Sequence, residues 1–214
     1  MKAFFRPGIV ILLSCILLTG CSRSPIPELG NVNVVTGFFA EYFPEEQSYR
    51  LSLEIADFSG YEKSSDITAK RITAKGKTIA YAFEKINQIS EKQLYISHAK
   101  VILLGRGFQA LNLKNTIDFF LNHPEINSDI QICMTQTDIL SEQEDSDSSF
   151  FAPLSSLLKR ETLCGFPSLY QLYQKENQSF SLPVVSLNDA TPAISSSAVF
   201  SNYQYQRTVQ NDIS

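Results

Sequence analysis

Apolar and polar residues alternate with a period of two in several short segments, as half-buried strands do. The clearest alternation runs over residues 49–55, and a second one runs over residues 129–134. Strand-forming residues also fill three further segments, residues 32–39, 67–75 and 93–104. The last of these ends at Gly105-Arg106-Gly107, and the polar residues 59–66 predict a turn between two of the strands.

Other segments carry apolar residues at helical spacing. Thr78 is a suitable N-cap for the first helix. The apolar face expected there consists of Ile79, Ala82, Phe83, Ile86 and Ile89. A second face, which should stop near His123-Pro124, consists of Leu113, Ile117, Phe120 and Leu121. Residues 154–158 and 169–173 predict two short helices.

Towards the C-terminus the chain becomes extended again at residues 183–185, alternates weakly over residues 193–205 and ends in polar residues 206–214. The succession of strand, helix, strand, helix and strand predicts an α+β fold, in which a mixed sheet is flanked by helices.

The N-terminus has a different pattern. A basic head that contains Lys2 and Arg6 is followed by an apolar run over residues 9–18. This is the layout of a secretory signal, and the run has about half the length that a bilayer crossing needs. It closes with Leu18-Thr19-Gly20-Cys21, which resembles the lipobox of bacterial lipoproteins.

That resemblance implies cleavage before Cys21 and attachment of a diacylglycerol to its thiol. We therefore expect residues 1–20 to be a lipoprotein signal peptide and residues 21–27 to be a tether. Buried acyl chains add roughly 0.8 kcal/mol per methylene to membrane affinity, so two or more chains anchor a protein stably. The alternative is an ordinary cleaved signal, with Cys21 a chance cysteine.

The charge of the mature chain argues against two classes of partner. From Cys21 onwards, 16 basic residues face 22 acidic ones, a formal charge of −6. Because the lysines are dispersed, the sequence has neither the electrostatic footprint of a nucleic-acid-binding protein nor a polybasic patch for anionic lipid.

Cysteine chemistry is limited by the same N-terminal processing. Cys15 would leave with the signal and Cys21 would carry the lipid, so Cys133 and Cys164 remain. They form a single disulfide, as exported proteins allow, or they are two buried thiols that behave as small hydrophobic residues. The sequence leaves both alternatives open.

Candidate catalytic residues are few. His98 lies in the expected strand beside Ser97, and neighbours on a strand point to opposite faces, so the two do not form a nucleophile–base pair. We expect a structural role for His98 and a solvent-facing one for His123. The sequence has no zinc-ligand spacing, P-loop or nucleophile elbow. We therefore expect no catalytic residue, no metal site and no cofactor, and a protein that is not an enzyme.

One run of motifs resembles the Ger(x)C family, the lipoprotein C subunits of spore germinant receptors. The motifs, in order, are Gly76-Lys77-Thr78-Ile79, the segment Leu94-Tyr95-Ile96-Ser97-His98-Ala99-Lys100 continuing to Gly105, residues 116–121 and Pro124-Glu125. Glu28, Leu182-Pro183 and Ala198-Val199-Phe200 match further family landmarks. The resemblance covers roughly residues 21–205.

The chain departs from the family pattern at four points. The tryptophan that often follows the lipid cysteine is missing, Asn122 stands where the family usually has arginine, and residues 37–39 replace a Gly-x-Asp motif. Family members also continue into a C-terminal domain. We therefore expect residues 28–187 to form a germination-protein-like α+β domain, and residues 188–214 to be the start of a truncated second domain with a polar tail.

The resemblance implies a lipid-anchored subunit on the extracytoplasmic face of the inner spore membrane. It would act in germination with a multi-span A-type subunit and a permease-like B-type subunit, and no ligand-binding residue can be carried over. The alternative function is that of a generic surface lipoprotein that binds a solute or a cell-wall partner.

Overall fold

The computed structural model describes residues 32–57, 68–139, 148–161, 166–188 and 191–210. The first strands and helices in chain order are β1 (Val32–Phe43), β2 (Ser48–Asp57), β3 (Thr68–Gly76), α2 (Ile79–Ile89), β4 (Gln93–Tyr95), β5 (Val101–Leu104) and the 3₁₀ helix η2 (Arg106–Ala110). The later ones are α3 (Lys114–Asn122), β6 (Gln131–Thr135), α5 (Phe151–Glu161), α6 (Leu169–Tyr173), β7 (Ser179–Asn188), β8 (Thr191–Ser201) and β9 (Gln204–Gln210).

The described strands form one nine-stranded sheet in the order β3-β2-β1-β5-β6-β7-β8-β9, with β4 paired to β1. Its centre is parallel, because β1, β5, β6 and β7 run in the same direction. Antiparallel hairpins extend it on both sides, β2 and β3 at one edge and β8 and β9 at the other. The expected α+β fold with a mixed sheet is thus confirmed.

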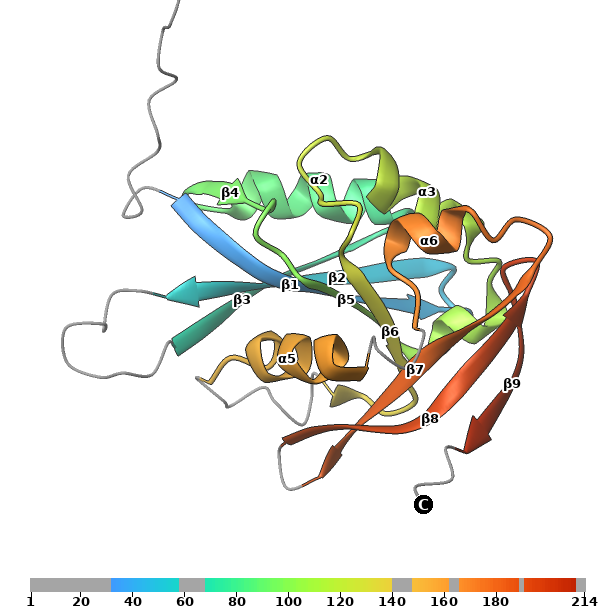
Figure 1. Cartoon of the computed structure of the whole chain (residues 1–214). Helices are drawn as coiled ribbons and strands as arrows, with labels where there is room; N and C mark the ends of the chain where they lie inside the picture. Colours follow the sequence, from blue (N-terminus) through green and yellow to red (C-terminus); the bar gives the residue numbers. More distant parts are fainter. Residues whose placement is uncertain (1–31, 58–67, 140–147, 162–165, 189–190, 211–214) are drawn as a thin grey trace, which may run out of the picture.

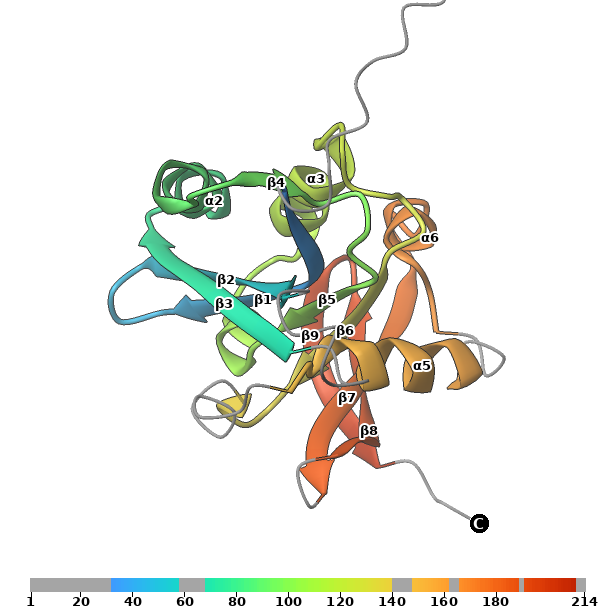
Figure 2. The same cartoon turned by 90° about the vertical axis from the view of Figure 1, so that its left-hand side faces the viewer.

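Helices cover both faces of the sheet. Helices α2, α3 and α6 lie on one face and α5 lies on the other (Figures 1 and 2). Neighbouring residues of a central strand therefore enter different cores: Phe38 packs with the three-helix layer and Phe39 with α5. Double coverage also explains why all four residues of β5 are buried, since a strand between two layers has no polar face.

Helix α2 follows the predicted pattern except at its end. The Thr78 side chain accepts the backbone N–H of Tyr81 at 3.1 Å, which confirms the N-cap. Four of the five predicted face residues are buried, but Ile89 is 58% exposed, so its assignment to the core was wrong. Ile89 is the last residue of the helix, and spacing predicts a face without showing how far the covering layer extends.

The predicted continuous strand over residues 93–104 is also wrong. Val34 pairs with Tyr95 and Gly37 pairs with Val101, so two residues of β1 face five residues of the neighbouring segment. The residues between Tyr95 and Val101 that have no partner on β1 form a turn. In it the N–H of Ala99 donates to the carbonyl oxygen of Ile96 at 3.0 Å. β4 and β5 are the two halves of one interrupted strand.

The last described strands continue the same sheet. Residues 206–210, expected within a polar tail, belong to the edge strand β9, which pairs with β8. Asn202 and Tyr203 connect the two strands with left-handed φ angles of 50° and 62°. The expected domain boundary after residue 187 falls at the end of β7 and remains a prediction.

Candidate functional site

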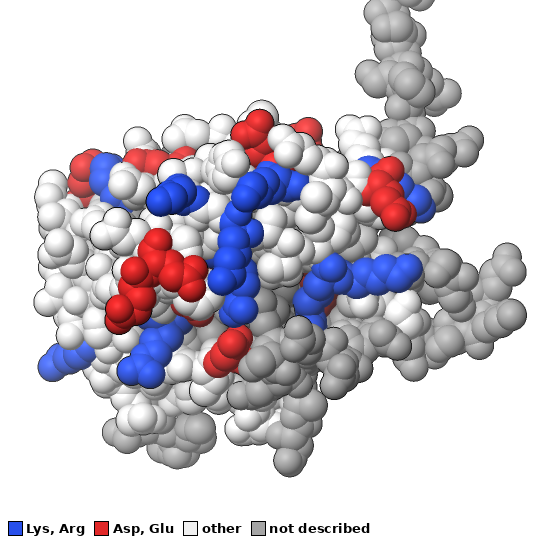
Figure 3. Space-filling view, turned by 180° about the vertical axis from the view of Figure 1, so that it is seen from behind, with Lys and Arg blue, Asp and Glu red and all other residues white. Residues whose placement is uncertain are grey.

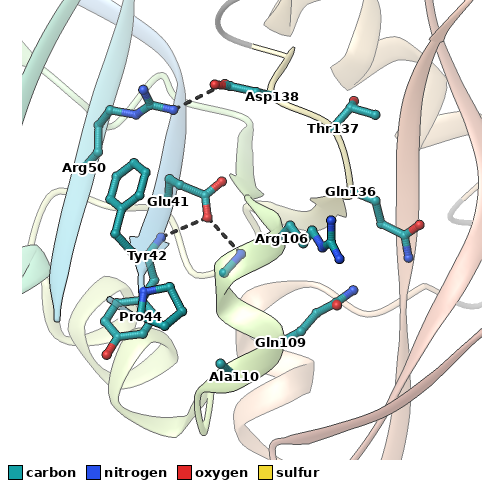
Figure 4. Close-up of a pocket in the computed structure, with 12 residues that line it drawn as sticks. Glu41, Tyr42, Pro44, Arg50, Arg106, Gln109, Ala110, Gln136, Thr137 and Asp138 are labelled. Atoms are coloured by element: carbon teal, nitrogen blue, oxygen red, sulfur yellow. Dashed lines mark hydrogen bonds and ion pairs between the residues drawn. The ribbon is translucent and has the colours of Figure 1, made fainter. Parts of the chain in front are cut away.

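A cavity lies at the carboxyl ends of the parallel strands. It has a volume of about 510 Å³ and is bordered by the ends of β1, β5 and β6. Open sheets with parallel strands bind ligands at this edge, because the connecting loops leave a crevice there. The cavity is lined by Glu41, Tyr42, Phe43, Pro44, Arg50, Arg106, Gly107, Gln109, Ala110, Gln136, Thr137 and Asp138 (Figure 4).

Glu41 is the anchored carboxylate of this cavity. Its Oε1 accepts the N–H of Gly107 at 2.8 Å and that of Tyr42 at 3.0 Å. Burial raises the pKa of Glu41, and these two hydrogen bonds, together with the charge of Arg50, oppose the rise. The side chain is therefore fixed in orientation, while its surroundings disfavour its negative charge.

Two glycines make this arrangement sterically feasible. A Cβ at Gly105 would overlap the Glu41 carboxylate, and one at Gly107 would overlap the carbonyl of Tyr42. The backbone of η2 can approach the end of β1 only because neither position has a side chain. The Gly-Arg-Gly sequence is not a dinucleotide loop. Its two glycines let the backbone of Arg106 lie close to the end of β1, where the Glu41 carboxylate is held.

Arg50 forms the opposite wall, on β2. One Nη donates to Asp138 at 3.3 Å, and the guanidinium lies over the Phe43 ring, 5.3 Å from its centroid. Arg50 Nε is buried and has no hydrogen-bond partner among the residues that the structure describes. A buried donor without a partner lowers the stability of the folded state by about 1–3 kcal/mol, so the N–H of Arg50 Nε is available to a hydrogen-bond acceptor that enters the cavity.

Another carboxylate, the fully buried Glu54, has a structural role on the α5 side. It is 1% exposed and accepts hydrogen bonds from Thr36, Ser149, Phe150 and Phe151. Two of these donors are backbone N–H groups at the start of α5, which have no partner within the helix. Glu54 therefore joins β2 to the N-terminus of α5.

Ser97 and His98 lie in the turn between β4 and β5, away from the cavity described above. His98 is exposed in this turn and does not lie on the strand that the sequence predicted, so its expected structural role remains a prediction. The two residues are looped out because β1 offers too few partners for this segment.

His123 is the C-cap of α3, as the stop at His123-Pro124 predicted. It is only half-buried, and its ring packs edge-on against Phe83 with 5.0 Å between centroids. Its role is thus partly structural rather than purely solvent-facing.

Cys133 is a free, fully buried thiol, which is one of the two alternatives left open by the sequence. Its Sγ lies 3.7 Å from the carbonyl oxygen of Ile102, and burial raises the pKa of the thiol. A thiol with a raised pKa is a poor nucleophile. Cys164 and the lipidation candidate Cys21 lie outside the described residues.

Charged side chains are interleaved on the back of the molecule. Figure 3 shows a band of Lys and Arg side chains there, with Asp and Glu on both sides of it. Opposite charges also pair directly, as Lys75 on the edge strand β3 does with Glu46 at 3.6 Å. Because positive and negative charges alternate, this face produces no strong long-range electrostatic field that would attract a polyanion.

Within the described part of the chain, no cluster of three His, Cys, Asp or Glu residues could hold a metal ion. None of the helices described here is both long and apolar enough to cross a membrane.

Sequence reasoning missed the cavity residues because they are far apart in the chain. Glu41 and Arg50 flank a turn, Arg106 follows β5, and Asp138 follows β6. One signal was present: polar residues follow several predicted strands, and where such strands are parallel these residues gather at one edge of the sheet. Using it required the strand order, which the sequence pattern did not supply.

Comparison with known proteins gives three results. A family model described as the spore germination protein N-terminal domain matches residues 27–200. No curated protein gives a significant match. Among solved structures, the chain is similar to one titled "Crystal Structure of the GerBC protein", with 11% identity and a TM-score of 0.41. The match covers 82% of this chain and 52% of that chain, so this chain spans about half the length of that protein.

Proposed function

Because the chain belongs to the spore germination protein family whose N-terminal domain it carries over residues 27–200, we propose that it is the lipid-anchored C subunit of a nutrient germinant receptor. The family match is the observation that carries this proposal. The lipobox at Leu18–Cys21 supports it independently, since residues outside the matched segment supply that motif.

In this proposal a lipid on Cys21 holds the protein on the extracytoplasmic face of the inner spore membrane. Residues 21–31 connect this anchor to the start of β1 at Val32. An extended chain spans at most about 3.6 Å per residue, so the folded body stays close to the bilayer. Its partners are a multi-span A-type subunit and a permease-like B-type subunit.

The proposed role is non-enzymatic. The residues that line the cavity around Glu41 include no histidine or cysteine. The hydroxyl groups among them are those of Tyr42 and Thr137. The buried carboxylate Glu54 is used to hold α5 in place. Binding and assembly are therefore the activities that these side chains support best.

Co-purification tests the proposal directly. A tagged copy would be recovered from gently solubilised spore membranes, and the proteins recovered with it identified by mass spectrometry. We expect one multi-span subunit and one permease-like subunit. Recovery of the intact, lipidated protein alone would instead favour an independent surface lipoprotein that binds a solute or a wall component.

A genetic test is complementary. Spores that lack this gene and every paralogue should germinate poorly on nutrients. Normal nutrient germination of such spores would refute the receptor role, whatever the protein binds in vitro.

A further inference from the structure

Two arginines, Arg50 and Arg106, line the cavity at the carboxyl ends of β1, β5 and β6. Arg106 is exposed and makes no hydrogen bond or ion pair with any residue in the part of the chain that the structure describes. Arg50, by contrast, is partly neutralised by Asp138 at 3.3 Å. Glu41 accepts its hydrogen bonds from the backbone N–H groups of Tyr42 and Gly107, so Arg106 is not the partner of that carboxylate in the described part of the chain.

Further hydrogen-bond donors surround Arg106. Figure 4 shows its guanidinium on the same side of the cavity as the amides of Gln109 and Gln136, which come from η2 and from the segment after β6. The Gln136 amide donates one N–H to Thr208 at 2.9 Å and has a second N–H left. A guanidinium with two amides is the donor set that recognises carboxylate and phosphate oxygens.

The position of Arg106 is built into the backbone. The flanking residues Gly105 and Gly107 must lack side chains for η2 to rest against the end of β1. The N–H of Gly107 is further fixed by its bond to Glu41 at 2.8 Å. The backbone at Arg106 is thus held in place at the rim of the cavity, which sets where its guanidinium can reach.

The negative side chains in the cavity do not cancel this cation. Asp138 is engaged by Arg50. Glu41 Oε1 accepts two backbone N–H groups, and burial raises the pKa of Glu41, which favours its neutral form. When protonated, Glu41 would itself become a hydrogen-bond donor.

We propose that this cavity binds a small molecule through an oxyanion group, a carboxylate or a phosphate, held by Arg106 with the amides of Gln109 and Gln136. Its volume of about 510 Å³ lies within the range of small-molecule sites. This site goes beyond the proposed receptor role and does not depend on it.

Binding of two simple probes tests the proposal. The purified full-length protein in detergent would be titrated with inorganic phosphate and with succinate, at an ionic strength held constant with chloride. We expect saturable binding, measured by calorimetry, of at least one probe. Saturation by phosphate alone would identify a phosphate site, whereas saturation by succinate would identify a carboxylate site. Absence of saturable binding of both probes would overturn the proposal.

Variants locate the site. Arg106→Ala should weaken binding of the probe at least tenfold. Arg160→Ala removes an exposed arginine of α5 that does not line the cavity, and it should bind as the parent does. Equal binding by the Arg106→Ala variant and the parent protein would overturn the assignment to this cavity.

Glu41→Gln provides a second, independent readout. Glutamine retains a carbonyl oxygen for the two backbone N–H groups and removes the negative charge, so the affinity for sulfate should rise. Sulfate keeps its charge as the pH changes, so the parent should bind it more tightly as the pH falls, and the variant should lose this dependence. Weaker sulfate binding by a folded Glu41→Gln protein would contradict the proposed arrangement.

Discussion

The carboxylate of Glu54, on β2, accepts the backbone N–H of Phe150 at 2.9 Å, immediately before α5 begins. The same carboxylate accepts the N–H of Phe151 at 3.3 Å and the hydroxyl of Ser149 at 2.6 Å. A negative charge at a helix N-terminus is favourable, because the free N–H groups and the helix dipole point towards it. One side chain of the sheet thus determines where α5 starts and how it is attached.

Loss of this carboxylate should destabilise the protein. In Glu54→Ala, buried N–H groups at the start of α5 lose their acceptor, which should lower the free energy of unfolding by about 3 kcal/mol. Chemical denaturation measures the change. Glu84→Ala, at an exposed position of α2, is the matched control and should change it by less than about 0.5 kcal/mol. Similar midpoints for the two variants would show that Glu54 does not hold α5.

The packing of α2 depends on Phe83. This residue is 7% exposed, and its ring lies edge-on to those of Phe119 and His123. Phe83→Ala should lower the free energy of unfolding by roughly 3–5 kcal/mol, because it leaves a cavity between α2 and α3. Tyr81→Ala, on the solvent side of the same helix, should have a small effect. An unchanged thermal transition for Phe83→Ala would contradict the observed helix face.

Much of this fold follows from local patterns. The run Ile79-Ala82-Phe83-Ile86 predicted α2 and its buried face, and Pro124 marked the end of α3, because periodicity and caps act over a few residues. Edge strand β9 was not predicted. Its residues are mostly polar, and its hairpin turn uses Asn202 and Tyr203 rather than an Asn-Gly pair.

The interrupted strand and the cavity depend on relations between distant segments. Whether Ser97 and His98 continue a strand is decided by the number of residues that β1 offers between Val34 and Gly37, which local propensity does not encode. The meeting of Glu41 with Gly107 depends likewise on β1 lying next to β5. Such relations become visible only when the strand order is known.

The stability of the protein should depend on the protonation of Glu41. Its pKa is raised in the folded protein, chiefly by burial. The folded state therefore binds the proton more tightly, and this stabilisation is complete below the unfolded pKa and is lost as the pH rises through the folded pKa. Glu41→Gln cannot lose a proton, so its stability relative to the parent should increase over that pH window. Denaturation of both proteins across this range measures it; a constant difference would contradict the raised pKa.

Under the proposed function, attachment of the protein by itself to the membrane should depend on a lipid on Cys21. In Cys21→Ala no thiol is available for the lipid, so the variant, expressed without the other receptor subunits, should appear in the soluble fraction. Fractionation of cells followed by a wash at high salt measures this. Cys15→Ala, within the expected signal peptide, is the matched control and should stay with the membrane. A Cys21→Ala protein that remains in the membrane fraction after the wash would show that something other than a lipid on this residue holds it there.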